Sequence, residues 1–132
     1  MLFTLTYVSR ETVRLSPDEL GLLARTSARE NARLGVTGVL LYADGYFLQR
    51  LEGPKGDLLA LYRRIQRDPR HDVLLLTDVQ DLPERLFDGW GMALVDARTL
   101  DEEGEWRTLL DGLCRDPSQA DALARRIVPL LA

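Results

Sequence analysis

The chain has 132 residues, of which 45% are hydrophobic and 29% charged, and this composition suits one compact domain with an ordinary core. Its net charge of -4 argues against a general nucleic-acid binder, because neutralising phosphates requires a clustered basic surface. Cys114 is the single cysteine, which excludes an intrachain disulfide, and we find neither a signal-peptide pattern nor a membrane-spanning apolar run, so we expect a cytoplasmic protein that does not enter a membrane.

The first expected elements are a strand and a capped helix. Residues 2–9 alternate between two faces, which is the period of a β-strand. Ser16 and Glu19 then have the spacing of a capping box, which predicts the start of a helix. This helix should end near residues 31–35, where a glycine can take the left-handed exit conformation.

A hairpin and a second helix follow. Residues 36–42 and 46–52 are rich in β-forming side chains and flank an Asp-Gly pair at residues 44 and 45, which predicts two antiparallel strands. Gly53 and Pro54 then open a helix with apolar positions on one face. Asp68 before a proline marks its expected end.

Two more strands complete the expected sheet. We place one at residues 73–79 and another at residues 87–95, although two glycines weaken the second assignment. The order βαββαββ calls for two right-handed crossovers onto one face of a mixed sheet. The expected fold class is therefore α+β, with a ferredoxin-like mixed sheet and two helices on one of its faces.

The pattern changes beyond Leu100. Residues 101–113 and 117–131 look helical, and the second segment carries an apolar stripe that must be buried somewhere. We therefore expect a main domain at residues 1–98 and a C-terminal helical appendage at residues 99–132.

Two polar side chains fall on apolar faces of strands that should be neighbours. Tyr7 alternates in phase with apolar residues of the first strand, and Gln49 does so with Phe47 of the third. A buried amide has two donors and an acceptor, and each unsatisfied polar group costs about 1–3 kcal/mol. One reading is that a heteroaromatic ligand between the two helices completes the network. The other is that Tyr7 and Gln49 bond each other, the backbone and buried water.

Asn31 allows two readings as well. Its amide offers a carbonyl and an NH2 group, which matches a ligand edge that alternates acceptor and donor. Asparagine near a helix end also serves in helix termination without any ligand. The residue alone leaves both readings open.

At these residues the chain resembles the BLUF family, the blue-light sensors that use FAD. The resemblance covers about residues 1–98 and rests on an ordered set of motifs. In chain order these are Tyr7, Asn31, Gly35-Val36-Thr37-Gly38, Phe47-Leu48-Gln49, Leu51-Glu52-Gly53, Tyr62-Arg63-Arg64-Ile65, Asp68, Arg70-His71, Trp90 and Met92.

The resemblance implies a role for each matching position. Tyr7 is the expected electron and proton donor, Gln49 bridges it to the flavin ring, and Asn31 contacts the carbonyl and imide edge of the ring. The cofactor implied is FAD, with FMN or riboflavin as alternatives, and no metal is expected. The remaining expected pocket residues are Leu23, Phe47, Arg64, Ile65, Asp68 and His71. Glu30 is a departure, because many relatives carry a neutral group there, and it puts a second ring contact in doubt.

The same resemblance suggests how a signal leaves the site. Trp90 and Met92 should share one face of the fifth strand and act as the relay from Gln49, although ordinary packing explains them equally well. The tail resembles no catalytic domain, so we expect a sensor and not an enzyme, acting on a downstream signalling protein in trans or through a homo-oligomer. Interface patches are expected on the outer sheet face or on the stripe through Leu123 and Ile127.

Rival functions find weaker support in the sequence. A small ferredoxin-like hydrolase or monooxygenase is the enzyme alternative. Phosphate chemistry would want a glycine-rich loop with a well-placed cation after the first strand, and Ser9-Arg10-Glu11-Thr12 is a poor match. His71 is the one histidine, which disfavours metal catalysis. An RNA-binding module would pair aromatic side chains with basic ones on the open sheet. A light-insensitive ferredoxin-like domain for protein interaction or small-molecule binding stays open.

Overall fold

A single mixed sheet organises the chain in the computed structural model, which describes residues 1–100 and 103–131. The strands lie in the order β4-β1-β3-β2-β6, and the short β5 pairs with β1. β1 and β3 are antiparallel neighbours at the centre, and β2 pairs with β6 in parallel. The strands span β1 Phe3–Glu11, β2 Thr37–Ala43, β3 Tyr46–Gly53, β4 His71–Leu76, β5 Gln80–Asp81 and β6 Ala93–Asp96.

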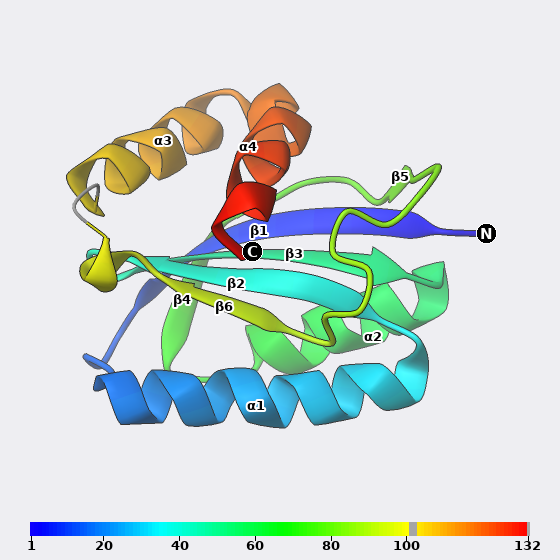
Figure 1. The fold of residues 1–132 in the computed structure, drawn as a ribbon, viewed down its shortest axis with the longest axis horizontal. Helices are drawn as coiled ribbons and strands as arrows, with labels where there is room; N and C mark the ends of the chain where they lie inside the picture. Colours follow the sequence, from blue (N-terminus) through cyan, green and yellow to red (C-terminus); the bar gives the residue numbers. More distant parts are fainter. Residues whose placement is uncertain (101–102, 132) are drawn as a thin grey trace.

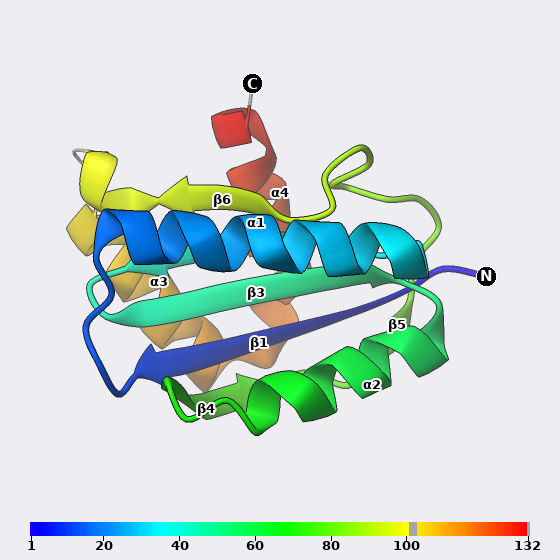
Figure 2. The same cartoon turned by 90° about the horizontal axis from the view of Figure 1, so that it is seen from below.

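Helices cover both faces of this sheet. α1 (Pro17–Leu34) and α2 (Lys55–Gln66) lie side by side on one face, as Figures 1 and 2 show. α3 (Glu103–Arg115) and α4 (Ala120–Ile127) lie on the other face (Figure 1). Short 3-10 segments at Ala97–Thr99, Pro117–Gln119 and Val128–Leu131 connect and end this second pair. The expected α+β plan with two helices on one face is confirmed, and the expected helix start at Asp101 lies outside the described residues.

Local chemistry fixes the ends of α1. The Ser16 hydroxyl accepts a hydrogen bond from the Glu19 amide at 3.1 Å, and the Glu19 carboxylate accepts one from the Ser16 amide at 3.1 Å. At the other end Gly35 has a φ of 68°, which glycine adopts at no steric cost. The predicted capping box and glycine exit are both confirmed.

The predicted hairpin is also present. Asp44 and Gly45 have φ values of 49° and 81°, and this pair of positive angles is typical of a type I′ turn. β2 and β3 pair along their whole length, from Thr37 opposite Glu52 to Ala43 opposite Tyr46. A turn of this type suits the twist of paired strands, so the hairpin sets the register of β2 and β3. In this register Gln49 faces α1 and α2.

The C-terminal helices form a second core on the face opposite α1 and α2. Trp106 and Leu110 of α3 are 3% and 0% exposed, and Leu123 and Ile127 of α4 are 6% and 0% exposed. They pack on sheet residues such as Leu48. The expectation that the outer sheet face, or the stripe through Leu123 and Ile127, offers an interface patch is therefore wrong, because each covers the other.

The expected strand at residues 87–95 is much shorter than predicted. Only Ala93–Asp96 forms β6, and residues 86–92 form an irregular loop that runs to it. Gly89 has a φ of 86°, and a Cβ on Gly91 would lie 2.6 Å from the Ala28 carbonyl oxygen of α1. The loop thus bends and then packs against α1, which a regular strand could not do.

Among the described residues, no helix is both long and apolar enough to cross a membrane.

Candidate functional site

A cleft lies between α1 and α2, over the central strands β1 and β3. It consists of an inner cavity and an adjoining outer cavity, whose space of about 480 Å³ and about 710 Å³ includes space continuous with the solvent. The two share lining residues such as Leu23, Gln49, Ile65 and Asp68. All the expected pocket residues line one or both: Tyr7, Leu23, Asn31, Phe47, Gln49, Arg64, Ile65, Asp68 and His71. Their roles toward a ligand stay predictions.

Tyr7 and Gln49 sit directly opposite each other in the β1–β3 register and both face the inner cavity. Tyr7 is 2% exposed and Gln49 is 6% exposed. Burial raises the pKa of the Tyr7 phenol well above its ordinary value, and the negative charge of Asp68 and the neighbouring Tyr62 add to this rise. The hydroxyl therefore keeps its proton and remains a hydrogen-bond donor.

The polar atoms of this pair are poorly satisfied by the protein. Within residues 1–100 and 103–131, the Tyr7 side chain borders the inner cavity and makes no hydrogen bond, and the Gln49 side chain makes one, its Nε2 donating to Met92 Sδ at 3.6 Å. A thioether is a weak acceptor. In the described part of the chain, Tyr7 and Gln49 therefore make no hydrogen bond to each other. A ring with carbonyl and imide groups would supply the missing donors and acceptors, so these residues fit a flavin.

Asn31 faces the outer cavity from the buried side of α1 and is 3% exposed. Its Nδ2 donates to the Gly91 carbonyl at 2.8 Å, which ties α1 to the loop ahead of β6. Helix termination is carried by Gly35 and by the Asn31 main chain, whose carbonyl accepts from the Val36 amide at 2.9 Å. The Asn31 side chain is thus not the terminator that one reading of the sequence suggested.

His71 is held rigidly at the inner end of the cleft. Its Nε2 lies 2.9 Å from the Ile65 carbonyl, which can only accept, so this nitrogen carries a proton. In the neutral ring, Nδ1 then accepts from the Ser9 hydroxyl at 2.8 Å. The ring centroid lies 6.3 Å from that of Tyr7 and 6.2 Å from that of Phe47. Ser9 was not predicted, and its position two residues beyond Tyr7 on the same strand face was the available signal.

Charged side chains line the rim of the cleft in opposite-sign pairs. Arg64 of α2 donates to Glu30 of α1 at 2.8 Å, so the pair spans the opening between the helices. Arg70 forks onto Asp68, and this hydrogen bonding lowers the pKa of the Asp68 carboxyl below its ordinary value. Glu30, noted in the sequence as an unusual carboxylate, therefore has a cation beside it. Arg70 was missed as a lining residue because its partner precedes it by two residues, a contact that helical periodicity does not reveal.

Trp90 and Met92 differ sharply in their surroundings. Met92 is 6% exposed and contacts the Gln49 amide, whereas Trp90 is 44% exposed and faces away from the core. The expectation that they share one strand face is wrong, because both lie in the loop before β6. The loop is fixed to the sheet at Trp90, whose carbonyl accepts from the Gly38 amide at 3.0 Å.

Glu52 anchors the start of this loop, a role that was not predicted from the sequence, although the residue belongs to one of the family motifs found there. It is 0% exposed, and its carboxylate accepts from Thr37 Oγ1 at 3.0 Å and from the amides of Leu86 and Phe87 at 2.7 and 3.0 Å. Three hydrogen-bond donors satisfy this buried carboxylate. An acidic side chain in a segment expected to form a buried strand was the signal that could have found it.

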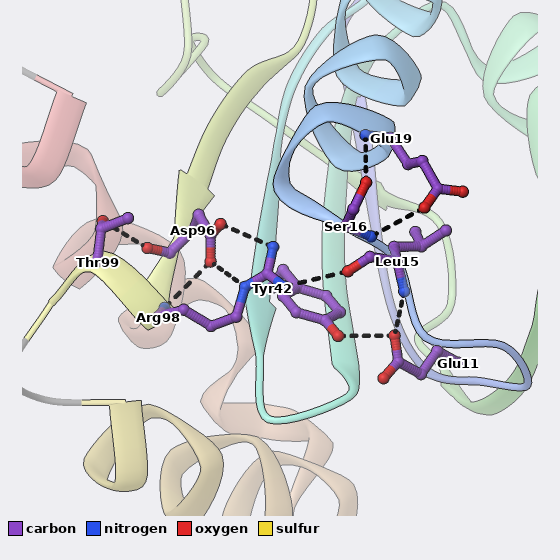
Figure 3. Close-up of polar contacts among 8 residues, drawn as sticks. All are labelled: Glu11, Leu15, Ser16, Glu19, Tyr42, Asp96, Arg98 and Thr99. Atoms are coloured by element: carbon purple, nitrogen blue, oxygen red, sulfur yellow. Dashed lines mark hydrogen bonds and ion pairs between the residues drawn. The ribbon is translucent and has the colours of Figure 1, made fainter.

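A polar network joins the cavity wall to the start of the tail (Figure 3). Leu15, which lines the inner cavity, donates its amide to Glu11 at 3.4 Å, and its carbonyl accepts from Arg98 at 3.1 Å. Arg98 also forks onto Asp96 with two contacts of 2.9 Å. The Tyr42 hydroxyl donates to Glu11 at 2.6 Å, and burial together with this bond raises the pKa of Tyr42 to about 12. The network thus couples the N-terminal end of α1 to the segment after β6.

Comparisons with curated proteins return light-regulated relatives. The chain is 43% identical over 86 residues to photoactivated adenylate cyclase subunit beta of Euglena longa, and this stretch is 65% of the chain and 10% of that protein. It is 32% identical over 111 residues to the blue light- and temperature-regulated antirepressor BluF of Escherichia coli K12, covering 84% of the chain and 28% of that protein. The chain thus spans about a tenth of the length of the cyclase relatives it matches.

Solved structures agree over a larger part of the chain. The dark-state structure of BlrB, a BLUF protein, matches with a TM-score of 0.78 and 34% identity over 98% of this chain and 97% of that one. Klebsiella pneumoniae BlrP1 with FMN and cyclic diGMP matches with a TM-score of 0.72 and 30% identity, over 90% of this chain and 36% of that one.

A family sequence model described as "Sensors of blue-light using FAD" matches residues 2–93. The match does not support the light-insensitive alternative. On this match, together with the fold and the cleft, the chain belongs to the BLUF family and is a blue-light sensor that uses FAD.

Proposed function

We propose that Tyr7 and Gln49 form the light-responsive pair of this sensor and that the cleft between α1 and α2 holds the flavin ring. The single observation that carries the proposal is the register that sets Tyr7 opposite Gln49 on the cavity floor, with hydrogen-bonding capacity that the described protein atoms leave unused. Buried polar groups are usually satisfied, so an unfilled pair points to a ligand.

The walls of the cleft suit a flat heteroaromatic ring. Leu23 and Ile65 come from the two helices and pack on the faces of the ring, and Phe47 closes its inner end. Asn31 offers its amide to the carbonyl and imide edge from the outer cavity. Arg64, Asp68 and His71 complete the rim around the polar part of the cofactor. FAD is the family's cofactor, and we infer that FMN or riboflavin can enter the same cleft, because this contact set is built around the ring.

The chemistry begins at Tyr7. Bound flavin that has absorbed blue light supplies a strong oxidant. Tyr7 would give the bound flavin an electron and its phenol proton, with Gln49 as the bridge, and would then regain both. The Gln49 amide would end rotated or tautomerised, with its donor and acceptor presented differently to the cleft. The net result is a new hydrogen-bond arrangement without turnover, which is a bias between two conformations.

The output begins where the Gln49 amide changes partners. Its Nε2 contacts Met92 Sδ at 3.6 Å, so a turned amide alters the loop that carries Met92 and Trp90 into β6. We infer that this loop is one relay to the surface. In the cytoplasm, the signal then passes to a downstream signalling protein in trans or changes the homo-oligomeric state of the chain. The cyclase and antirepressor named among the relatives illustrate two kinds of effector.

The test is the absorption spectrum of the purified protein. We expect a yellow protein whose flavin absorption shifts reversibly to the red under blue light. Colourless protein that rejects added flavin would defeat the proposal.

A second test concerns retention of the flavin. Asn31→Ala removes the amide that faces the outer cavity and also frees the Gly91 carbonyl, so we expect weaker flavin binding in a titration followed by fluorescence quenching. Thr26→Ala, at another residue that lines the outer cavity, is the matched control. Unchanged affinity in Asn31→Ala would assign Asn31 to loop attachment alone.

A further inference from the structure

The side chain next to Gln49 on β3 points through the opposite face of the sheet. Arg50 is 2% exposed and lies on the side covered by the C-terminal helices. Its Nη2 donates to Asp121 of α4 at 3.1 Å, whereas its Nε is buried without a hydrogen-bond partner in the described part of the chain. Burial also lowers the pKa of the guanidinium, which reflects the cost of holding this charge away from water. A buried cation with one contact and one unmet donor is poorly anchored.

The carboxylate that holds Arg50 has another partner. The Asp121 side chain is 56% exposed and also accepts from Arg125 at 3.0 Å. Water and Arg125 can therefore satisfy Asp121 if Arg50 leaves. Loss of the Arg50–Asp121 contact therefore leaves Asp121 with other hydrogen-bond donors. The free-energy cost of breaking the pair falls on Arg50.

Arg50 has a second place to go. A cavity of about 500 Å³ lies beside it, between β1, the segment after β4 and the start of α4. Besides Asp121 it is lined by Asp78 and by the threonines Thr4, Thr6 and Thr77. Thr77 is tied to Thr6 of β1 by two bonds of 2.9 Å, and Thr6 is the register partner of Arg50, so the segment after β4 that carries Asp78 is held against the strand beside β3. The cavity thus offers a second carboxylate and several hydroxyl oxygens.

We propose that Arg50 relays the state of Gln49 to the C-terminal helices by moving its guanidinium from Asp121 on α4 to Asp78 across this cavity. The inference rests on the proposed role of Gln49 as the light-responsive amide. Adjacent strand residues share one peptide unit, so a shift of β3 at Gln49 displaces Arg50 on the other face. Two discrete carboxylate partners make Arg50 a two-state element of the kind that coupling between distant sites requires.

The consequence for α4 follows from its small size. Its eight residues are held to the sheet by the apolar contacts of Leu123 and Ile127 and by the Arg50–Asp121 pair, and they are linked to α3 by the exposed Glu105–Arg126 pair. Release of Asp121 removes the polar anchor at the first turn of α4, so this helix opens more often.

The test is amide hydrogen exchange of the full chain loaded with FAD, in darkness and under blue light, with absorption recorded on the same samples. In the wild-type chain, light should speed exchange in α4 about tenfold, the scale of one lost hydrogen bond to a charged group. Asp121→Asn should show this faster exchange already in darkness with little further change in light. Asp78→Asn should match wild type in darkness and lose the light effect. Both variants should keep the red shift, because neither residue lines the flavin cleft.

Two controls separate relay from simple anchoring. Asp121→Glu keeps a carboxylate and should restore the light effect. Glu105→Gln removes the exposed contact of Glu105 with Arg126, which links α3 to α4 away from the sheet, and should leave the light-to-dark ratio unchanged. An Asp121→Asn chain that retains the full light-to-dark ratio, or an Asp78→Asn chain that still responds, would overturn the relay. So would a wild-type chain that shifts to the red without any change in α4. A missing red shift in every sample would instead overturn the proposed function, and the relay with it.

Discussion

The two faces of the sheet differ in how completely their side chains are packed. The face under α3 and α4 is filled by apolar side chains, with Leu110 and Ile127 fully buried and Arg50 as its poorly anchored cation. The face under α1 and α2 keeps a cleft with Tyr7 and Gln49 on its floor. One face stabilises the fold, and the other gives up packing for a site.

The largest expected effect is on the tail face. Leu110→Ala deletes a side chain that is 0% exposed and should lower the free energy of unfolding by about 2–5 kcal/mol. Leu23→Ala, on the cleft face, removes a side chain that already borders empty space and should cost much less in the flavin-free protein. Denaturant unfolding of both variants measures the difference. Equal losses would mean that the cleft face is packed as tightly as the tail face.

The next effect concerns the loop at the edge of the sheet. Glu52→Ala leaves the amides of Leu86 and Phe87 and the Thr37 hydroxyl without their acceptor, which should cost about 1–3 kcal/mol of stability. The same change should speed amide exchange at residues 86–92 more than in α3. Glu84→Ala, an exposed carboxylate just ahead of that loop, is the control. Uniform loosening of the whole chain would contradict a local anchoring role.

The helix caps and the hairpin were predictable from sequence because they depend on residues close in the chain. Local sequence is enough to predict three of these features: the Ser16–Glu19 capping box, the Gly35 helix end and the Asp44-Gly45 turn. The lining of the cleft also followed from strand alternation and from the family resemblance. The loop before β6 did not, because its path is set by Glu52 and by the close approach of Gly91 to α1, contacts between segments distant in sequence.

The destination of the tail was out of reach of sequence for a related reason. The apolar stripe through Leu123 and Ile127 predicts that one face of this helix is buried, but it does not identify the surface that buries it. The same holds for ion pairs across the rim. Nothing in the spacing of Glu30 and Arg64 reveals that α1 and α2 bring them to 2.8 Å.

A smaller effect should appear at high pH. The pKa of Tyr42 is raised to about 12 in the folded chain from an unfolded value near 10, so the folded state holds its proton over that range while the unfolded state releases it. This contribution to stability is complete below pH ~10 and is lost as pH rises toward ~12. Tyr42→Phe should therefore reduce the slope of stability against pH in that window. An unchanged slope would assign the alkaline loss to other groups, Tyr7 first.

The smallest effect is expected at the rim of the cleft. Glu30→Gln removes an ion pair whose carboxylate side chain is 43% exposed, so the stability change should be within about 0.2–1 kcal/mol and should shrink in high salt. Flavin-free protein should be used, so that ligand contacts do not enter the measurement. If Glu30→Gln lowered the free energy of unfolding by several kcal/mol, the ion pair at the rim would be a main stabilising contact of the fold, contrary to this prediction.

The central claim is that a buried phenol and a carboxamide read the state of the flavin. Tyr7→Phe keeps the ring and its packing and removes only the hydroxyl, so the variant should bind flavin with its ordinary dark spectrum. Under blue light it should fail to form the red-shifted state that the unmodified chain forms. A normal, reversible red shift in Tyr7→Phe would remove Tyr7 from its proposed role.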